Sequence, residues 1–240
     1  MTEERMMPQA HSLGQSLVLH LAPGVLLTVA FLFAAPLVIR AGGSSYLALI
    51  LCIPLILVPI ETGLLLREKR KSGLPWKSML LLRDRADVSL FTVLPIAAGL
   101  YVLSIAGTLL VAPFRSAILS EAVASLPPWA IVDDLPKNIS AGVLFLGLLL
   151  SGIVAPVVEE IYFRGFLLPR MPISRDWAPV VNAALFSVYH FFSPWNYIAI
   201  FLAFLPLAYY VRFKGRLLPA IVTHCLFNSV GIVTALIKIS

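Results

Sequence analysis

Long apolar runs separated by short polar gaps follow one another along all 240 residues of the chain. Most runs reach the roughly 20 residues that a helix needs to cross a bilayer, and their continuous hydropathy favours helices over barrel strands. The pattern predicts an all-α, polytopic integral membrane protein with about seven transmembrane helices, within a range of six to eight. The predicted segments are 17–39, 46–66, 88–112, 139–168, 179–192, 196–211 and 217–237. The fifth and sixth are short, so they also fit a hairpin that does not fully cross the bilayer.

The composition supports this fold class. Hydrophobic residues make up 60% of the chain and charged residues 12%, whereas charged residues form about a quarter of soluble proteins. We expect one membrane domain over 1–240, because no second soluble domain fits. Cys52 and Cys225 lie inside apolar segments without disulfide or metal-binding spacing, so they are expected to be small core residues.

The basic residues gather in the gaps between the predicted helices. The densest run lies between Arg67 and Asp87, which the positive-inside rule places on the cytoplasmic side. Alternate crossings then give a cytoplasmic N-terminus, an exposed non-cytoplasmic connection between Pro113 and Asn138, and a C-terminus outside. This topology explains the net charge of +6 without a nucleic-acid partner. A bacterial plasma membrane is expected, with an organelle membrane as the alternative.

Three charged side chains interrupt the apolar run over 141–169, namely Glu159, Glu160 and Arg164. Each ionisable group near the bilayer centre costs about 2.5–3.5 kcal/mol, so three together indicate a function inside the membrane. Glu160 and Arg164 stand at i and i+4, the spacing of an ion pair, while Glu159 is rotated by about 100° around the helix. We expect a structural ion pair between Glu160 and Arg164, with Glu159 facing a cavity. Glu61 is expected to reach toward the cytoplasmic surface and has no predicted role.

Two further pairs at i and i+4 lie in later segments. They are Phe186 with His190, and His224 with Asn228. Glu159 and the two histidines supply the ligand count of a catalytic zinc site that keeps one position open for water. Without a metal, Glu159 and His190 would instead polarise a water as general base and orienter. His224 and Asn228 would then donate to the oxyanion of a tetrahedral intermediate. Both alternatives predict attack of water on an amide, with Phe186 packing at a helix contact or forming a wall of the pocket.

These elements resemble the motifs of a known family. They read Glu-Glu-x-x-x-Arg from Glu159, Phe-x-x-x-His from Phe186 and His-x-x-x-Asn from His224. In this order they resemble the CAAX-protease and bacteriocin-processing (CPBP, Abi-domain) family of intramembrane endopeptidases, which includes type II CAAX prenyl proteases. The resemblance covers 139–238, the expected catalytic core, whereas 1–138 holds N-terminal spans and the basic cytoplasmic loop.

The resemblance implies an all-helical protease in which Glu159 and His190 activate water. In that family pattern His224 and Asn228 stabilise the oxyanion or help to bind a metal, so Zn²⁺ is a possible cofactor. The depths of Glu159 and His224 in their helices, at 1.5 Å per residue, predict a cavity that faces the cytoplasm.

The predicted function is therefore hydrolysis of a peptide bond in a membrane-associated peptide or lipidated protein, with a prenylated CAAX protein as one candidate. Membrane lipid is the other expected partner, and the oligomeric state is open. One alternative is a proton- or ion-coupled carrier in which Glu159 and the histidines relay protons. A second alternative is a catalytically silent immunity or scaffold protein. A carrier should show interrupted spans in matching halves and a silent member should have lost a motif residue, and the sequence shows neither.

Overall fold

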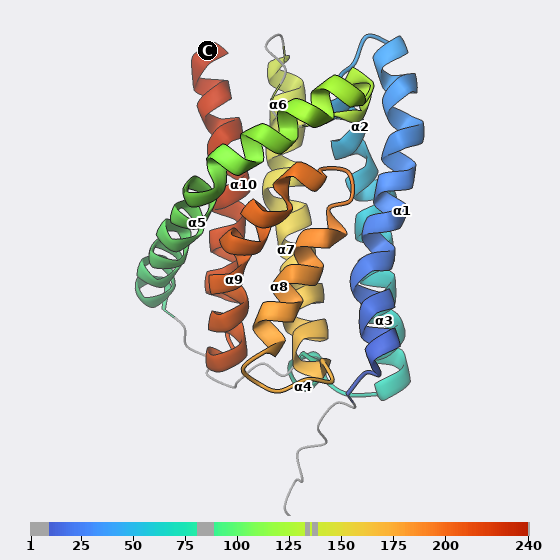
Figure 1. Cartoon of the computed structure of the whole chain (residues 1–240). Helices are drawn as coiled ribbons and strands as arrows, with labels where there is room; N and C mark the ends of the chain where they lie inside the picture. The colour runs from blue at the N-terminus through green and yellow to red at the C-terminus, as the bar shows by residue number, and fades with distance from the viewer. Residues whose placement is uncertain (1–9, 81–88, 133–134, 136–138, 240) are drawn as a thin grey trace, which may run out of the picture.

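The computed structural model describes residues 10–80, 89–132, 135 and 139–239, and all regular structure in these ranges is helical. The helices lie side by side in a bundle, crossed obliquely by the long α5 (Figure 1). The α-helices are α1 (Leu13–Arg40), α2 (Ser45–Cys52), α3 (Val58–Ser72), α4 (Trp76–Met79), α5 (Leu90–Ser125), α6 (Ala141–Leu149), α7 (Ala155–Glu159), α8 (Ala178–Tyr189), α9 (Tyr197–Lys214) and α10 (Leu218–Ile239).

Several helices are joined without a break by stretches of different winding. A π-helix at Ile53–Leu57 links α2 to α3, and another at Leu150–Val154 links α6 to α7. A third π-helix, Glu160–Leu167, continues α7. Short 3₁₀ turns lie at Pro128–Ala130, Leu168–Arg170 and Pro194–Asn196.

Six of the resulting helices are long and apolar enough to cross a membrane. They cover Leu13–Arg40, Ser45–Ser72, Leu90–Ser125, Ala141–Arg170, Pro194–Lys214 and Leu218–Lys238. The fifth predicted segment, 179–192, corresponds to α8, which has only 12 residues. The prediction of an all-α, multi-pass membrane protein is confirmed, and the hairpin alternative applies to α8, which is too short to cross.

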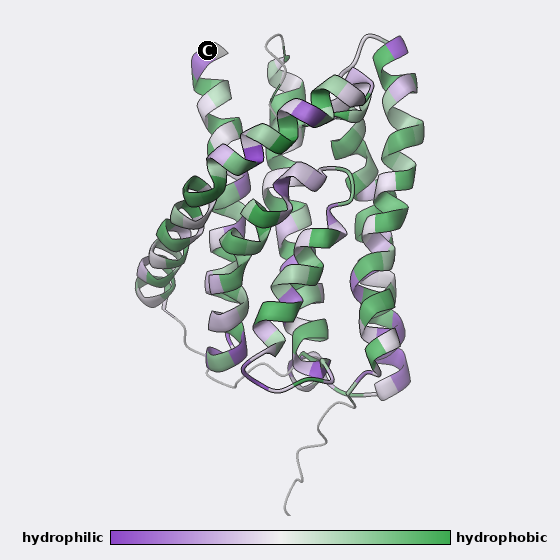
Figure 2. Cartoon of the chain, viewed as in Figure 1, coloured by the Kyte–Doolittle hydropathy of each residue, from purple (hydrophilic) through white to green (hydrophobic). Residues whose placement is uncertain are grey.

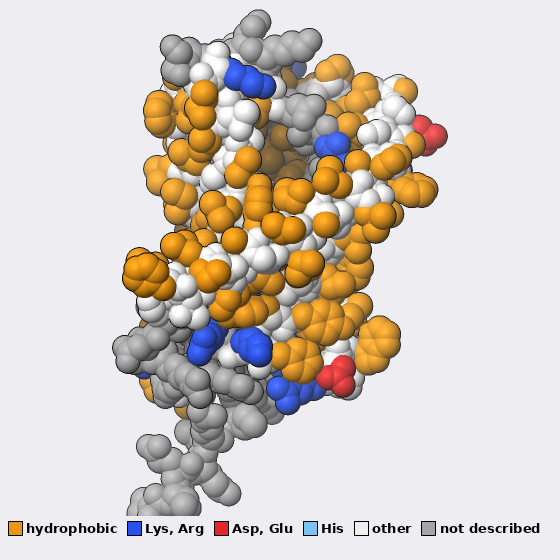
Figure 3. All heavy atoms as spheres, turned by 90° about the vertical axis from the view of Figure 1, so that its left-hand side faces the viewer, with side chains coloured by type: hydrophobic (Ala, Val, Ile, Leu, Met, Phe, Trp, Pro, Cys, Tyr) orange, Lys and Arg blue, Asp and Glu red, His pale blue; other side chains and the backbone are white. Residues whose placement is uncertain are grey.

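The outer surface suits a lipid environment. Hydrophobic residues dominate the helices between their ends (Figure 2), and hydrophobic side chains cover the face that contains α5 (Figure 3). On α5, Leu110 is 75% exposed and Phe114 67% exposed. Such large exposed apolar side chains are stable in contact with lipid tails and would be unfavourable in water.

The helix α5 is longer than predicted. The expected exposed connection after Pro113 is helical as far as Ser125, and Pro113 lies inside the helix. Proline removes only one backbone donor, and the following residues are mostly good helix formers. The remaining part of that connection includes 133–134 and 136–138, which lie outside the described residues.

Positive charge is concentrated at one end of the bundle, here called the basic end. It contains the end of α3, the short α4 and the end of α9 (Figure 1). Its described basic residues are Arg67, Lys69, Arg70, Lys71, Lys77, Arg170, Arg175, Arg212, Lys214 and Arg216. The C-terminus lies at the other end, here called the opposite end (Figure 1).

The helix α1 packs tightly against the end of α8 at Gly24. A Cβ atom on Gly24 would lie 2.1 Å from the backbone oxygen of Tyr189. No side chain fits there unless one backbone moves, so this glycine sets how close α1 comes to the end of α8.

We expect Gly24→Ala to destabilise the protein by about 1–3 kcal/mol, the usual cost of overpacking. The measurement is thermal unfolding in detergent micelles. Gly99→Ala is the matched control, because Gly99 is also inside a helix and a Cβ there would meet nothing within 4 Å. Equal melting temperatures for the two variants would contradict the tight contact.

Candidate active site

The site is built on the irregular helix that runs from α6 to Leu167. Its first π-helical stretch, Leu150–Val154, breaks the regular backbone hydrogen bonding, and side chains of α10 bond to its carbonyls. Asn228 Nδ2 donates to Ser151 O at 3.0 Å, and Ser229 Oγ donates to Gly152 O at 3.3 Å. Gly152 permits this approach, since a Cβ there would lie 2.6 Å from Ser229 Oγ. These contacts hold α10 in register with α7.

A buried ion pair lies at the centre of the bundle. Arg164 Nη1 is 3.1 Å from Glu160 Oε1, and both side chains are 0% exposed. The guanidinium carbon of Arg164 also lies 4.0 Å from the centre of the Phe186 ring, which adds a cation–π contact. The predicted pair between Glu160 and Arg164 is confirmed.

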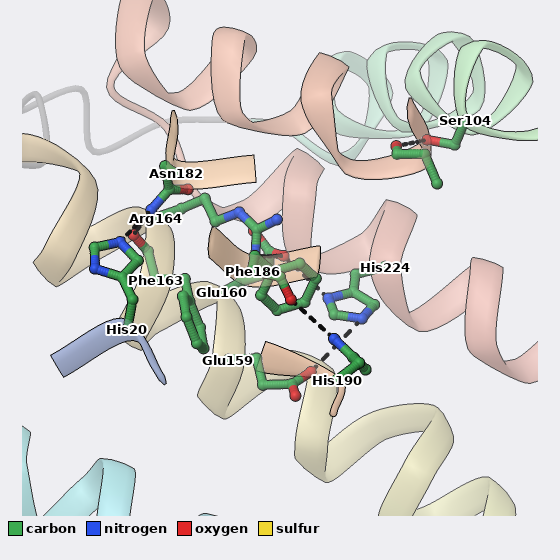
Figure 4. A network of polar contacts seen from close by, with 11 residues as sticks. His20, Ser104, Glu159, Glu160, Phe163, Arg164, Asn182, Phe186, His190 and His224 are labelled. Carbon is green, nitrogen blue, oxygen red and sulfur yellow. Dashed lines mark hydrogen bonds and ion pairs between the residues drawn. The ribbon is translucent and has the colours of Figure 1, made fainter. Parts of the chain in front are cut away.

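Glu160 has a second partner that the sequence did not reveal. His224 Nδ1 lies 3.0 Å from the same oxygen, Glu160 Oε1, so the ring N–H donates to this carboxylate (Figure 4). The contact turns the other ring nitrogen toward Glu159, with His224 Nε2 3.7 Å from Glu159 Oε2. Glu160 therefore orients His224 as well as pairing with Arg164. A contact between residues 64 positions apart leaves no periodic signal in the sequence.

His190 is fixed by the end of α8. The helix stops at Tyr189, which leaves the carbonyl of Phe186 without its usual backbone partner. His190 Nδ1 bonds to that oxygen at 2.9 Å. With its proton on Nδ1, the ring keeps Nε2 as a free acceptor.

Phe186 does not line the cavity described below. Its ring is 0% exposed, lying under Arg164 with its centre 5.0 Å from the ring of His190 and 5.9 Å from that of His224. The structure thus places Phe186 at a helix contact behind the site, where it spaces the two histidines, and not in the pocket wall.

A cavity of about 600 Å³ brings the four predicted catalytic side chains together. Glu159, His190, His224 and Asn228 all line it, although they come from three separate parts of the chain. The remaining wall is largely apolar and includes residues of the N-terminal half, among them Leu27, Leu49, Ile53 and Leu57. The site is therefore a polar patch in a largely apolar pocket inside the bundle.

The sequence had led us to expect a cavity that faces the basic end. In the structure the cavity extends toward the opposite end instead. From Glu159 its lining continues to Tyr46 at the start of α2, to Val132 and Leu135, and to Ile232 near the end of α10, all toward the opposite end. The physical reason is that α8 is short. The chain turns back at Pro194–Asn196 inside the bundle, so the space between this turn and the opposite end stays open for the cavity. Toward the basic end, fully buried side chains such as Tyr162 and Phe163 fill the bundle.

The predicted zinc ligands do not form a metal site as they are placed here. Zinc in enzymes takes three protein ligands at about 2 Å. Among the described residues, no group of three or more His, Cys, Asp and Glu side chains is arranged to hold a metal ion. Both histidines bond through Nδ1, His190 to Phe186 O and His224 to Glu160, so Nε2 is the ring nitrogen that each would offer to a metal.

Glu61 was expected to reach toward the cytoplasmic surface, but it lies inside the bundle. It is 0% exposed, and Tyr189 Oη donates to its Oε1 at 3.1 Å. The expectation was wrong because α3 continues for three turns beyond Glu61 to Ser72, which keeps its carboxyl inside the bundle.

Residues 141–230 match the family model described as type II CAAX prenyl endopeptidase Rce1-like. This segment is Rce1-like. The match confirms the resemblance that the motifs predicted for this part of the chain, and the Rce1-like segment contains Glu159, His190, His224 and Asn228 but not Glu61. No curated protein and no solved structure matches the chain.

The central ion pair gives a test of stability. We expect Arg164→Met to destabilise the protein by about 3–5 kcal/mol, because it leaves the buried Glu160 carboxylate without its cation. The double variant Glu160→Gln/Arg164→Met should recover part of this loss, since it removes both charges. Thermal unfolding in detergent micelles measures both effects.

Arg40→Met is the control, because Arg40 is exposed at the end of α1. Its melting temperature should stay at the wild-type value. If Arg164→Met behaved like Arg40→Met, or if the double variant were less stable than the single one, the ion pair would not have the role assigned to it.

Proposed function

We propose that this protein is an intramembrane endopeptidase that uses a side-chain-activated water to cleave a membrane-associated peptide. The observation that carries the proposal is the shared cavity of Glu159, His190, His224 and Asn228 within an Rce1-like segment. A buried carboxylate beside two imidazoles and an amide supplies the base and the donors that amide hydrolysis needs.

In the proposed reaction Glu159 takes a proton from a water that His190 Nε2 helps to orient. The water oxygen attacks the scissile carbonyl carbon, so a C–O bond forms and the carbonyl oxygen becomes an oxyanion. Asn228 keeps one amide N–H for this oxyanion, since the other is bonded to Ser151 O. The C–N bond then breaks, and the proton held by Glu159 passes to the leaving amine.

His224 is suited to stabilise the same oxyanion. Its Nδ1 is held by Glu160, so a proton on Nε2 would make an imidazolium whose charge Glu160 balances. This is the role that the carboxylate plays in serine-protease triads, where it fixes the ring and stabilises the charged form. In this proposal Glu160 is a positioning residue and Glu159 is the base.

The direction of the cavity bears on the substrate. If the positive-inside rule holds, the basic end is cytoplasmic and the cavity opens toward the other side of the membrane. We therefore favour a peptide whose apolar or lipidated end lies in the non-cytoplasmic leaflet. A prenylated CAAX protein at the cytoplasmic surface would need the inverse orientation.

The carrier alternative has less support. Between the cavity and the basic end the bundle is filled by fully buried side chains, among them Arg164, Tyr162 and Tyr189. A pocket closed on one side by a packed aromatic layer favours a site for chemistry over a path for transport.

Cleavage of peptides by purified protein tests the proposal. With a panel of lipidated and unlipidated peptides, we expect Glu159→Gln to lower kcat by about 10²–10⁴-fold, because it removes the general base. Asn228→Ala should lower kcat by about 10²–10³-fold, the usual effect of losing an oxyanion donor. Product formation is followed by mass spectrometry.

Glu121→Gln is the control, since Glu121 is an exposed carboxylate on α5. It should cleave as wild type does. Cleavage that persists in Glu159→Gln would exclude the proposed base, and a proton flux that depends on Glu159 in the absence of cleavage would favour a carrier. Elemental analysis of active, chelator-washed protein distinguishes the metal-free reaction from the zinc-dependent one.

The side from which the cavity is reached can be tested by thiol labelling. In a Cys52→Ala/Cys225→Ala background, Gly231→Cys places a thiol in the cavity wall and Lys214→Cys places one at the basic end. In intact cells an impermeant maleimide should label Gly231→Cys, and Lys214→Cys only after permeabilisation. The reverse pattern would show that the cavity faces the cytoplasm.

A further inference from the structure

The basic end carries a surface cluster that the proposed reaction does not use. It lies where the residues just before α8 meet the last turns of α9, and it is here called the α8–α9 corner. Figure 3 shows Lys and Arg side chains beside large hydrophobic side chains at this end of the bundle. The residues of the corner are Arg175, Trp177, Tyr209, Arg212, Phe213 and Lys214.

Aromatic contacts hold the corner together. The ring of Phe213 stacks with that of Tyr209, with 6.1 Å between the ring centres. The guanidinium carbon of Arg175 lies over the Phe213 ring, 5.0 Å from its centre, which is a cation–π contact. The Tyr209 hydroxyl donates to the backbone oxygen of Asp176 at 3.3 Å. Arg175 is thereby fixed beside the end of α9, where the residues on both sides of Phe213 are basic.

The corner has a net positive charge. Residues 174–177 and 209–216 contain four basic side chains, and Asp176 is their one acid. Cations gathered at one corner repel one another, so an anion that binds among them is stabilised. A guanidinium group donates two parallel hydrogen bonds to the oxygens of a phosphate, and the corner offers two such groups, Arg175 and Arg212.

The exposed aromatic side chains indicate which anion fits. Trp177 is 65% exposed and Tyr209 37% exposed, both beside the end of a helix long and apolar enough to cross a membrane. Exposed tryptophan and tyrosine are typical of the level at which lipid headgroups lie. An anionic phospholipid suits both features, because its phosphate meets the guanidinium groups while its acyl chains cover the aromatic rings. A free phosphate ion would leave the rings in water.

We propose that the α8–α9 corner binds the headgroup of an anionic phospholipid. Arg175 and Arg212 hold the phosphate, and Trp177 packs against the lipid where the headgroup joins the acyl chains. None of these residues lines the cavity, so the lipid site is separate from the candidate active site. The proposal does not depend on the proposed function.

Native mass spectrometry of the full chain in detergent tests this site, with phosphatidylglycerol as the anionic lipid and phosphatidylcholine as the neutral one. Wild type should bind phosphatidylglycerol more tightly. Arg175→Gln/Arg212→Gln should weaken that binding by about 30-fold, since each basic residue near an anionic headgroup contributes about fivefold. Binding of phosphatidylcholine should stay unchanged. Arg175→Gln alone, at an exposed residue, should weaken it by about fivefold, which decides the matter if the double variant does not fold.

Arg70→Gln/Lys71→Gln is the matched control. It removes the same charge from exposed residues of α3 at the same end of the bundle, and it should bind phosphatidylglycerol as wild type does. Equal losses in the two double variants would show that the lipid responds to the general charge of the basic end and would overturn the proposal. Equal wild-type affinity for the two lipids would overturn it as well.

Two further measurements distinguish a lipid from a free phosphate. Glycerol phosphate, which has no acyl chains, should not displace phosphatidylglycerol at equal concentration, and displacement would show that the phosphate alone is the ligand. Phosphatidylglycerol with brominated acyl chains should quench tryptophan fluorescence more in wild type than in Trp177→Phe. Equal quenching in both would exclude Trp177 from the site.

Discussion

The neutralisation of charge inside the membrane-spanning bundle is the constraint on which the site depends. Arg164 and Glu160 are both removed from solvent, and taking such a pair out of water costs several kcal/mol per ion that their attraction only partly offsets. The pair therefore adds little net stability. What it provides is a fixed carboxylate oxygen that orients the ring of His224. The oriented ring in turn places its Nε2 beside Glu159.

A second constraint is that backbone groups within a membrane must find partners in the protein. This chain departs from regular α-helix at several points. At these points side chains form hydrogen bonds with backbone carbonyls that have lost their usual backbone donors. Asn228 and Ser229 bond to the π-helical stretch at Ser151 and Gly152. His190 bonds to Phe186 at the end of α8. His190 and Asn228 thus each use one polar group to bond to a backbone carbonyl. Each also has a second polar group that is available to the cavity it lines.

The sequence predicted what is local or periodic. Apolar runs gave the helices to within a few residues, except for the end of α5, where polar residues between Pro113 and Ser125 suggested a connection although the backbone continues as a helix. The spacing of Glu160 and Arg164 gave their ion pair. The bond from His224 to Glu160 and the bond from Tyr189 to Glu61 join distant segments, so hydropathy and spacing carry no information about them. The direction of the cavity depends on how far α8 extends into the bundle, which is a tertiary property.

The close contacts of the N-terminal helices also mean that the Rce1-like segment is not a separable module. Tyr46 of α2 fills the place that a side chain on Gly147 would occupy, and Gly24 of α1 lies directly against the backbone of Tyr189. A chimera that joined 141–239 to the first helices of another protein would keep all three motifs. It would lose one wall of the cavity and the steric fit on which the motifs' arrangement relies, so possession of the motifs alone does not guarantee an assembled site.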